Sequence, residues 1–418
     1  MRNFNKLFVS LSVGGLGLFS TLANAESGSV NCFSGHELAE AVTTAAPGST
    51  LEVTGTCFGP INITVDDLIL IGNASGDRAV IEKSGFIPFP QDVVSIDGAR
   101  RVVLTGFDIK NGLAGVKGRG NASFKLEGVD VIDNIMGISL DSANLNVNNV
   151  NIKGTHPGAT IMGLNAENGS TVTMAGTVDV SGATVFGINA QTNSSIIIEE
   201  DAILRSHDNL MGAQITVKSS LFSKEGAELH FINNETMGFS VNTGATAMLF
   251  HSDLFANNNG LDGVDVVSAA SFEMDGDARL VSEFNGRQGI SIDNSAFNMF
   301  GFFSTEERLP NVTSRNNGAN GIQVENTSKF DVGRNASVDA RDNGEAGVFL
   351  DDGSSAVIQQ ANINNNNGIP VRGPKKRAAD IVASFGSRIT FNLSNNVGFL
   401  SCDRTSMARG DVRCNRRH

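Results

Sequence analysis

Hydrophobic and polar positions repeat along most of this chain with a period of about 25 residues. Each repeat places an Asn three or four residues before a Gly, and the Gly opens a short run in which apolar and polar residues alternate. Examples are IDNIMGISL (132–140), FNGRQGISI (284–292), NNGANGIQV (316–324) and DNGEAGVFL (342–350). Alternation with a period of two predicts a β-strand after each of these glycines.

Two further strands are predicted in each repeat. The second begins about eight residues after the first around a large apolar residue, as at Phe272, Phe297 and Phe330, and the third contains residues such as Phe231 and Val338. Three short strands in about 25 residues are typical of one coil of a parallel β-helix. The leucine-rich horseshoe is the nearest alternative at this period, but its LxxLxLxxN pattern is absent and no helical periodicity is present.

The repeated side chains have structural roles in such a stack. We expect the Asn to adopt the left-handed conformation of a tight corner, because Asn tolerates it best after Gly. Successive coils would place Asn over Asn about 4.8 Å apart, so that their amides hydrogen-bond along a ladder. The Phe residues that open the second strands, and Ser residues before them, would stack in the same way, so these serines are not expected to be nucleophiles.

The chain divides into four predicted segments. Residues 1–25 have a basic start, an apolar stretch and an Ala-Asn-Ala end, which is the pattern of a signal peptide, with a retained N-terminal anchor as the alternative. Residues 26–72 form an N-terminal cap and first coil, 73–400 the β-helix, and 401–418 a C-terminal cap and basic tail. No later stretch reaches the roughly 18 apolar residues of a membrane helix. We therefore expect an exported protein that is periplasmic, surface-located or secreted.

The four cysteines fall in two pairs at opposite ends of the repeats. A disulfide needs Cα atoms within roughly 7 Å of each other, which the two ends of an elongated stack cannot satisfy. We therefore predict the bonds Cys32–Cys57 and Cys402–Cys414, as suits an exported chain.

From about Cys32 to Cys414 the chain resembles the right-handed parallel β-helix, or pectate-lyase-like, superfamily. The resemblance includes the start of the repeats, with ELA (37–39), AAPGSTLEVTGTC (45–57), INI (61–63) and LILIG (68–72). It implies an all-β fold, a single-stranded right-handed parallel β-helix of about 12 coils. It also implies an N-terminal capping helix over about 36–46 and a C-terminal cap closed by a disulfide.

Enzymes of this superfamily act mostly on acidic polysaccharides, but their familiar motifs are missing or broken here. Arg308 and Pro310 are followed by Arg315, which breaks the RxPxxR spacing of pectate-lyase-like enzymes. Of the polygalacturonase-like motifs only Asp351-Asp352 is present. The chain has 26 Phe but no Trp and no Tyr, so a Tyr base is excluded and sugar stacking would depend on Phe alone.

An acidic column is one candidate site. Asp293, Glu325 and Asp351 each lie four residues after the Gly in consecutive coils, so their carboxylates should stack roughly 5 Å apart. Such a row suits Ca²⁺, which prefers oxygen ligands, or the paired acids of glycosidic cleavage. The alternative is a solvated turn in which Asp is simply a good turn former.

Two loops that break the period form the second candidate site. Residues 298–311 and 373–383 are predicted to leave the same corner and to flank a cleft, which makes Arg308, Lys375, Lys376 and Arg377 candidate substrate-binding residues. Net charge is −13, yet residues 371–418 contain ten Lys and Arg against three Asp. A polyanion would therefore contact the C-terminal end, unless this segment is only a solvated basic tail.

The functional prediction is an exported, non-catalytic binding or structural module that contacts polysaccharide, with an acidic polysaccharide as the expected partner. The alternative is a polysaccharide lyase or glycoside hydrolase with Asp293, Glu325, Asp351 or Arg308 as catalytic residues. Whether the chain is an enzyme stays open at this point. Ca²⁺ is the one cofactor suggested. We expect no nucleic-acid partner and no transmembrane segment, and the oligomeric state stays open.

Overall fold

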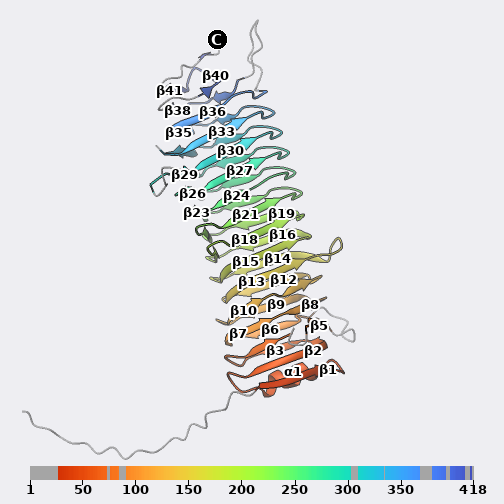
Figure 1. Ribbon diagram of the computed structural model, residues 1–418. Helices are drawn as coiled ribbons and strands as arrows, with labels where there is room; N and C mark the ends of the chain where they lie inside the picture. Colours follow the sequence, from red (N-terminus) through yellow and green to blue (C-terminus); the bar gives the residue numbers. More distant parts are fainter. Residues whose placement is uncertain are drawn as a thin grey trace, which may run out of the picture.

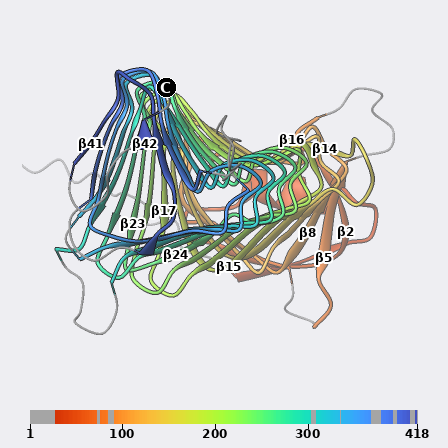
Figure 2. The same cartoon turned by 90° about the horizontal axis from the view of Figure 1, so that it is seen from above.

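The structure is a computed structural model that describes residues 27–72, 76–83, 91–302, 309–333, 335–367, 379–391, 396–409 and 415–416. The predicted signal peptide, Arg308, Cys414 and the basic triplet Lys375, Lys376 and Arg377 lie outside these residues. The described chain is a parallel β-solenoid of about 13 coils, close to the 12 expected from the repeats. Figure 1 shows the coils stacked from the N-terminal helix to the C-terminal strands, and Figure 2 shows them superimposed along the axis.

One strand from each successive coil, together with short strands at the ends of the stack, forms a 15-stranded sheet, here called sheet B. The other strands form a 27-stranded sheet, here called sheet A. All pairings are parallel. Sheet A bends into two faces, because its strands pair in two separate series that only the long strands β2, β13 and β15 join.

The strands of sheet B are β3 (Ile61–Ile63), β6 (Val94–Asp97), β9 (Ala114–Arg119), β12 (Met136–Asp141), β14 (Thr160–Glu167), β16 (Ala183–Ala190), β19 (Met211–Ile215), β22 (Phe239–Asn242), β25 (Val264–Val267), β28 (Ile290–Asp293), β31 (Ile322–Glu325), β34 (Val348–Leu350), β37 (Ile381–Ala383), β40 (Leu400–Cys402) and β42 (Asn415–Arg416).

The first face of sheet A contains β1 (Ser27–Cys32), β2 (Thr50–Gly59), β4 (Ile69–Ile71), β7 (Arg100–Thr105), β10 (Ser123–Glu127), β13 (Asn144–Lys153), β15 (Thr171–Ser181), β17 (Ser195–Ile198), β20 (Ser220–Ser223), β23 (Thr246–Phe250), β26 (Ser271–Asp275), β29 (Ala296–Phe300), β32 (Lys329–Val332), β35 (Ser355–Ile358), β38 (Arg388–Phe391) and β41 (Met407–Arg409). The second face contains β5 (Ala79–Lys83), β8 (Phe107–Lys110), β11 (Asp130–Ile132), β18 (Ile203–His207), β21 (Glu228–Ile232), β24 (Asp253–Phe255), β27 (Arg279–Glu283), β30 (Asn311–Arg315), β33 (Ser337–Arg341), β36 (Gln360–Ile363) and β39 (Asn396–Val397).

The core is a continuous column of apolar side chains inside the coils. Because successive strand residues point to opposite sides, most inward positions of the strands are aliphatic or Phe and most outward positions are polar. The predicted Phe stack is present: the rings of Phe272 and Phe297 are stacked with centroids 4.7 Å apart, and Phe330 meets Phe297 edge-on at 5.5 Å. Identical side chains therefore occupy equivalent positions in successive coils.

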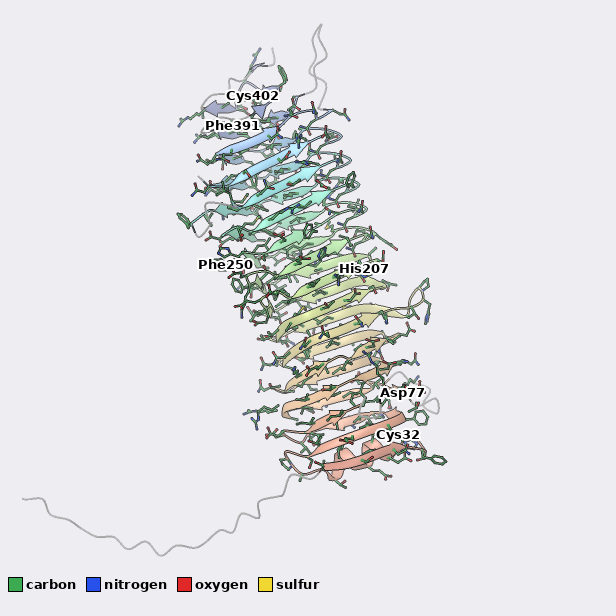
Figure 3. All side chains as sticks on the ribbon, viewed as in Figure 1. Cys32, Asp77, His207, Phe250, Phe391 and Cys402 are labelled. Atoms are coloured by element: carbon green, nitrogen blue, oxygen red, sulfur yellow. A yellow bond between two sulfur atoms is a disulfide. The ribbon has the colours of Figure 1, made fainter. Side chains whose placement is uncertain are left out.

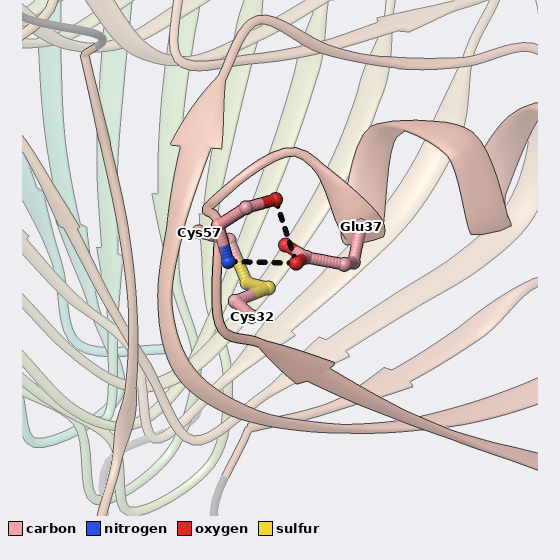
Figure 4. The surroundings of a disulfide bond; sticks show 4 residues. Cys32, Glu37 and Cys57 are labelled. Carbon is pink, nitrogen blue, oxygen red and sulfur yellow. Dashed lines mark hydrogen bonds between the residues drawn. A yellow bond between two sulfur atoms is a disulfide. The ribbon is translucent and has the colours of Figure 1, made fainter.

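The N-terminal end of the core is covered by α1 (Glu37–Thr44), as the resemblance implied. Its buried residues Leu38 and Val42 face β1, β2 and β3. The Cys32–Cys57 disulfide joins β1 to β2 beside the start of this helix, with a Cα–Cα distance of 5.1 Å (Figure 4). Glu37 accepts hydrogen bonds at 2.7 Å from the backbone and hydroxyl of Ser34. The predicted bond between Cys402 and Cys414 stays a prediction.

The Asn ladder lies at the corner that leads from sheet A into sheet B. It contains Asn209, Asn234, Asn259, Asn285, Asn317, Asn343 and Asn366, all of them buried. Each side-chain NH₂ donates to the side-chain oxygen of the next Asn at 3.0–3.3 Å. The same oxygen also accepts the backbone N–H of the preceding ladder Asn.

One part of the Asn prediction is wrong. The ladder Asn does not adopt the left-handed conformation, which belongs to the residue before it. Those preceding residues are Asp208, Asn233, Asn258, Phe284, Asn316, Asp342 and Asn365, with φ between 54° and 58°. The physical reason is that two consecutive residues make the corner. The first adopts the left-handed conformation and reverses the chain, and the second, the ladder Asn, turns its side chain inward to hydrogen-bond with the neighbouring coils.

Candidate functional site

The outer face of sheet B carries an unusual row of hydrogen-bonding side chains. One outward position per strand lies in parallel register from coil to coil. The row contains Ser95, Lys117, Ser139, Asn165, Asn189, Gln214, Ser240, Asp265, Ser291 and Gln323. Several of these side chains are almost completely buried although they point away from the core, including Asn165, Asn189, Ser240 and Asp265. This row is called the polar row below.

Amides in the first half of the polar row form a chain of hydrogen bonds. Asn189 donates to the side-chain oxygen of Asn165 at 2.8 Å, and Asn165 donates to the Glu167 carboxylate at 2.8 Å. Gln191 donates to the same Glu167 oxygen at 2.5 Å. The side-chain oxygen of Asn189 has no donor, although only 3% of this residue is exposed.

Farther along the same face, two carboxylates meet an arginine. Asp262 precedes β25 and Asp265 lies within it, while Arg287 precedes β28 in the next coil. The Arg287 guanidinium contacts both carboxylate oxygens of Asp262, at 2.9 Å from Nε to Oδ1, and the backbone N–H of Gln288 donates to the same Oδ1 at 3.0 Å. Asp262 is fully buried, whereas Arg287 is half exposed. We call Asp262, Asp265 and Arg287 the Asp–Arg cluster.

Asp265 is the titratable group that the fold perturbs most clearly on this face. Burial, and after it the neighbouring charge of Asp262, raise its pKa to about 6. Hydrogen bonds from Ser291 and Ser240 and the charge of Arg287 act in the opposite direction. A carboxyl group with this pKa is partly protonated near neutral pH and can donate as well as accept a hydrogen bond.

Gln288 extends the cluster into the next coil. Its NH₂ group donates to the Gln323 side-chain oxygen at 2.5 Å, and that oxygen also accepts from Asn320 at 3.0 Å. The side-chain oxygen of Gln288 has no donor, although only 8% of the residue is exposed. The face therefore holds two buried amide oxygens without a partner, one at Asn189 and one here.

The acidic column lies beside the polar row in the predicted register. Asp293 pairs with Glu325 across β28 and β31, and Asp351 follows β34 in the next coil. Asn326 donates to Asp293 at 2.6 Å, and Ser384 donates to Asp351 at 2.6 Å. Within the described residues no group of three His, Cys, Asp or Glu side chains is arranged to hold a metal. Ca²⁺ binding at the acidic column stays a prediction.

The two loops that break the period do not leave the same corner, contrary to the expectation. Residues 301–310 join β29 to β30, both in sheet A, whereas the second loop ends at β37 in sheet B. In that coil the strand of sheet B, β37, begins at Ile381. Arg308, Lys375, Lys376 and Arg377 lie outside the described residues, so their role in substrate binding stays a prediction.

Another charged group lies at the Asn corner. His207, labelled midway along the stack in Figure 3, contacts Asp179 through Nε2 at 3.1 Å and Asp208 through Nδ1 at 2.7 Å. The hydrogen bond to Asp179, together with that to Asp208, raises the pKa of His207 to about 9. The imidazolium joins two neighbouring coils, which is a structural role.

The sequence patterns did not predict the Asp–Arg cluster. Candidate acids were sought only at the fourth position after the Gly, which excluded both Asp262 and Asp265. The signal was nevertheless present in the segment Asp262-Gly263-Val264-Asp265, where acids flank the Gly-Val pair of one coil. The two acids lie on one face, because Arg287 contacts Asp262 and the charges of both act on Asp265.

Strand pairing establishes the fold class of the chain. The fold is a parallel β-helix. The resemblance expected from the sequence is therefore confirmed at the level of the fold. In the described part of the chain, no helix has the length and apolar character needed to span a bilayer.

Comparison with known proteins adds solved structures that share this architecture. No family model matches the chain, and no curated protein matches it. The A-module of the mannuronan C-5 epimerase AlgE4 from Azotobacter vinelandii is 12% identical with a TM-score of 0.41, covering 92% of this chain and 94% of its own. The AlgE6 A-module from the same organism is 13% identical (TM-score 0.32, 91% and 89%). The pectate lyase Pel9A is 12% identical (TM-score 0.36, 83% and 80%).

Proposed function

We propose that this protein is an exported β-helix that binds a polysaccharide along the outer face of sheet B. The observation that carries the proposal is the pair of buried amide oxygens without a donor, at Asn189 and Gln288. A buried acceptor left without a partner costs about 1–3 kcal/mol. If either side chain turns its oxygen toward the surface, a ligand donor such as a sugar hydroxyl would remove that cost.

The spacing of the two acceptors favours a polymer over a small molecule. β16 and β28 are separated by four steps of sheet B, which corresponds to roughly 19 Å at about 4.8 Å per step. Between them the polar row presents a hydrogen-bonding side chain in every coil. A chain of sugar rings offers hydroxyls at regular intervals and matches such a repeating surface.

Export supports a polysaccharide partner outside the cell. The Cys32–Cys57 disulfide suits an oxidising compartment, and the predicted signal peptide would direct the chain there. The compartment proposed is the periplasm, the cell surface or the medium. The acidic polysaccharide expected from the sequence would need the basic residues Arg308, Lys375, Lys376 and Arg377, or bridging Ca²⁺, to balance the acids of the described face.

Binding is tested with purified mature protein and a panel of polysaccharides in affinity electrophoresis, with and without Ca²⁺. Asn189→Leu and Gln288→Leu each remove one unpartnered acceptor and keep the side-chain size. We expect both to weaken binding about fivefold or more, because the ligand loses its acceptor. The unfolding free energy should fall by only about 1 kcal/mol, because each variant also loses the hydrogen bond that its NH₂ group donates in the free protein. Asn146→Leu, at an exposed position of β13 on sheet A, is the matched control.

Failure has a clear form in this experiment. If no polysaccharide retards the protein, or if both Leu variants bind as the natural protein does, the outer face of sheet B is not the binding face. For a positive result, the Asn146→Leu control must also bind the polysaccharide with the affinity of the natural protein.

The Asp–Arg cluster supports a second candidate function, the cleavage of a glycosidic bond. Two carboxyl groups in different protonation states are the usual requirement for this reaction. Asp265, with a pKa of about 6, would give its proton to the glycosidic oxygen, while Asp262, which Arg287 contacts and orients, would act as the second carboxylate. This candidate predicts new reducing ends, whereas a lyase would produce unsaturated ends that absorb in the ultraviolet.

Asp265→Asn separates the two candidate functions. It should abolish hydrolysis while retaining polysaccharide binding, and the rate of the natural protein should fall as the pH rises through about 6. Binding without any new chain ends on any member of the panel would leave the protein a binding module.

A further inference from the structure

An apolar strip runs beside the polar row on the outer face of sheet B. The outward residue just before the cassette Gly is Met136, Met162, Phe186, Met211 and Met237 in five successive coils. Strand pairing places Met136 against Met162, Met162 against Phe186, and Phe186 against Met211. All five side chains are partly exposed, so an uninterrupted column of large apolar groups lies at the surface.

The column is widened by the residues that precede it. Ile161 and Leu261 occupy this neighbouring position, and they are 41% and 38% exposed. The strip ends in the coil of Asp262, where the Asp–Arg cluster takes over the same outward position. Over five coils it extends for roughly 20 Å. A contiguous apolar surface of this kind marks a binding surface more often than chance exposure.

The charges on this stretch restrict what can bind. The five strands β12, β14, β16, β19 and β22 contain no Lys and no Arg, and their only acids are Asp141 and Glu167. A polyuronate would place a row of carboxylates on a surface without a single basic strand residue and beside two acids. Like charges brought together in this way oppose binding.

The two edges of the stretch differ in chemistry, so a ligand that fits both needs a hydrogen-bonding side and an apolar side. On one edge the amides of Asn165, Asn189 and Gln214 offer hydrogen bonds, and the oxygen of Asn189 lacks a donor. On the other edge Met and Phe offer only dispersion contacts, for which the flexible thioether of Met adapts to irregular shapes. Sugar rings with hydroxyls on one side and methyl groups on the other have both kinds of surface.

We infer that this stretch binds a polysaccharide without carboxylate groups, whose rings carry apolar substituents such as N-acetyl groups or the methyl groups of deoxy sugars. The inference rests on the proposed function and names its ligand class. It replaces the acidic polysaccharide that the sequence suggested, because the five strands of this stretch carry apolar groups and two acids where a polyuronate would need cations.

The test compares polymers with the same backbone and different substituents. Polygalacturonate is compared with its methyl ester, and glucosamine oligomers with N-acetylglucosamine oligomers, by isothermal titration calorimetry on the natural protein. We expect about tenfold tighter binding of the methyl ester and of the acetylated oligomer. Equal or tighter binding of polygalacturonate would overturn the inference while leaving polysaccharide binding itself intact. If no polymer of either pair binds, the proposed function fails together with the inference.

Variants of the strip supply the second measurement. Phe186→Ser should weaken binding of the preferred polymer about fivefold or more, and Phe186→Leu should restore most of it, because the loss follows the apolar contact area. Met162→Lys should weaken binding of the uncharged polymer. If Met162→Lys instead bound polygalacturonate more tightly than any other polymer, the result would contradict the inference. Met407→Gln, at an exposed Met of sheet A, is the control.

A competing occupant would give a different signature. If the strip were the contact between two copies of this chain, the sedimentation coefficient would rise with protein concentration and Met162→Gln would abolish that rise. Such a result, together with polymer affinities that Phe186→Ser leaves unchanged, would also overturn the inference.

Discussion

The side-chain NH₂ of Asn259 lies 3.0 Å from the side-chain oxygen of Asn285 in the next coil, and the backbone N–H of Asn259 donates to that same oxygen at 3.0 Å. A single buried oxygen thus accepts two hydrogen bonds from one residue of the neighbouring coil. The arrangement recurs along the ladder and joins each corner to the next by both main chain and side chain.

Removing one member of the ladder should therefore weaken the stack. Asn259→Ala takes away the oxygen that accepts the NH₂ and backbone N–H of Asn234. Leaving buried donors without a partner should lower the free energy of unfolding by about 1–3 kcal/mol, measured by urea titration. Asn146→Ala, at an exposed position of sheet A, should change it by less than about 0.5 kcal/mol. Equal effects of the two substitutions would show that the ladder adds no stability.

The protonation of Asp265 makes stability depend on pH. Its pKa is about 6 in the folded chain, against about 3.9 when unfolded, so the folded state holds the proton more tightly. This favourable contribution is complete below about pH 4 and is lost as the pH rises through 6. Asp265→Asn should remove the dependence and should be more stable than the natural protein at pH 8, by on the order of 2 kcal/mol. Parallel stability curves of both proteins from pH 4 to 8 would contradict this assignment.

Arg287 should be necessary because it balances a buried charge. Arg287→Met leaves the fully buried Asp262 carboxylate without its ion partner, which should cost about 3–5 kcal/mol of unfolding free energy. The double variant Asp262→Leu with Arg287→Met removes both charges and should recover much of that loss. Chemical denaturation of the two variants measures the difference. A single variant no less stable than the double variant would exclude the charge-balance explanation.

His207 should stabilise the fold only while it carries its proton. Its pKa of about 9 lies above the unfolded value of about 6.5, so the contribution is complete below about pH 6.5 and is lost as the pH rises through about 9. His207→Gln should therefore lower the melting temperature at pH 6 and leave it nearly unchanged at pH 10. His156, which is exposed near Asp133, provides a control substitution. A loss for His207→Gln that is as large at pH 10 as at pH 6 would refute the role of charge.

Sequence patterns predicted the parts of the fold that repeat. The Asn ladder, the Phe stack and the register of Asp293 with Glu325 all follow from one period, because parallel coils place equivalent residues side by side. The left-handed residue at the corner was assigned one position too late. Asn is common at both positions, so composition alone does not distinguish the corner residue from the ladder residue.

The candidate site was harder to predict because it is formed where the repeat departs from its own average. Asp262 occupies a position that is Met or Phe in the preceding coils, and Asp265 one that is Ser, Asn or Gln. Neither acid is unusual by itself. Their importance comes from facing the same side and from Arg287, which enters from the next coil, and these relations require the strand direction at a bulge that the sequence does not display.

The last member of the ladder is not an Asn. Asp380 accepts the NH₂ and backbone N–H of Asn366 through one oxygen, at 3.1 and 3.0 Å, and the backbone N–H of Phe399 through the other. Every amide before it donates toward the C-terminus, so the series requires a final residue that only accepts. Whole coils can consequently be duplicated or deleted between Asn209 and Asn366 without leaving an amide hydrogen unused. The length of the ladder can vary within those limits, whereas Asp380 ends the ladder although the sheets continue into β40.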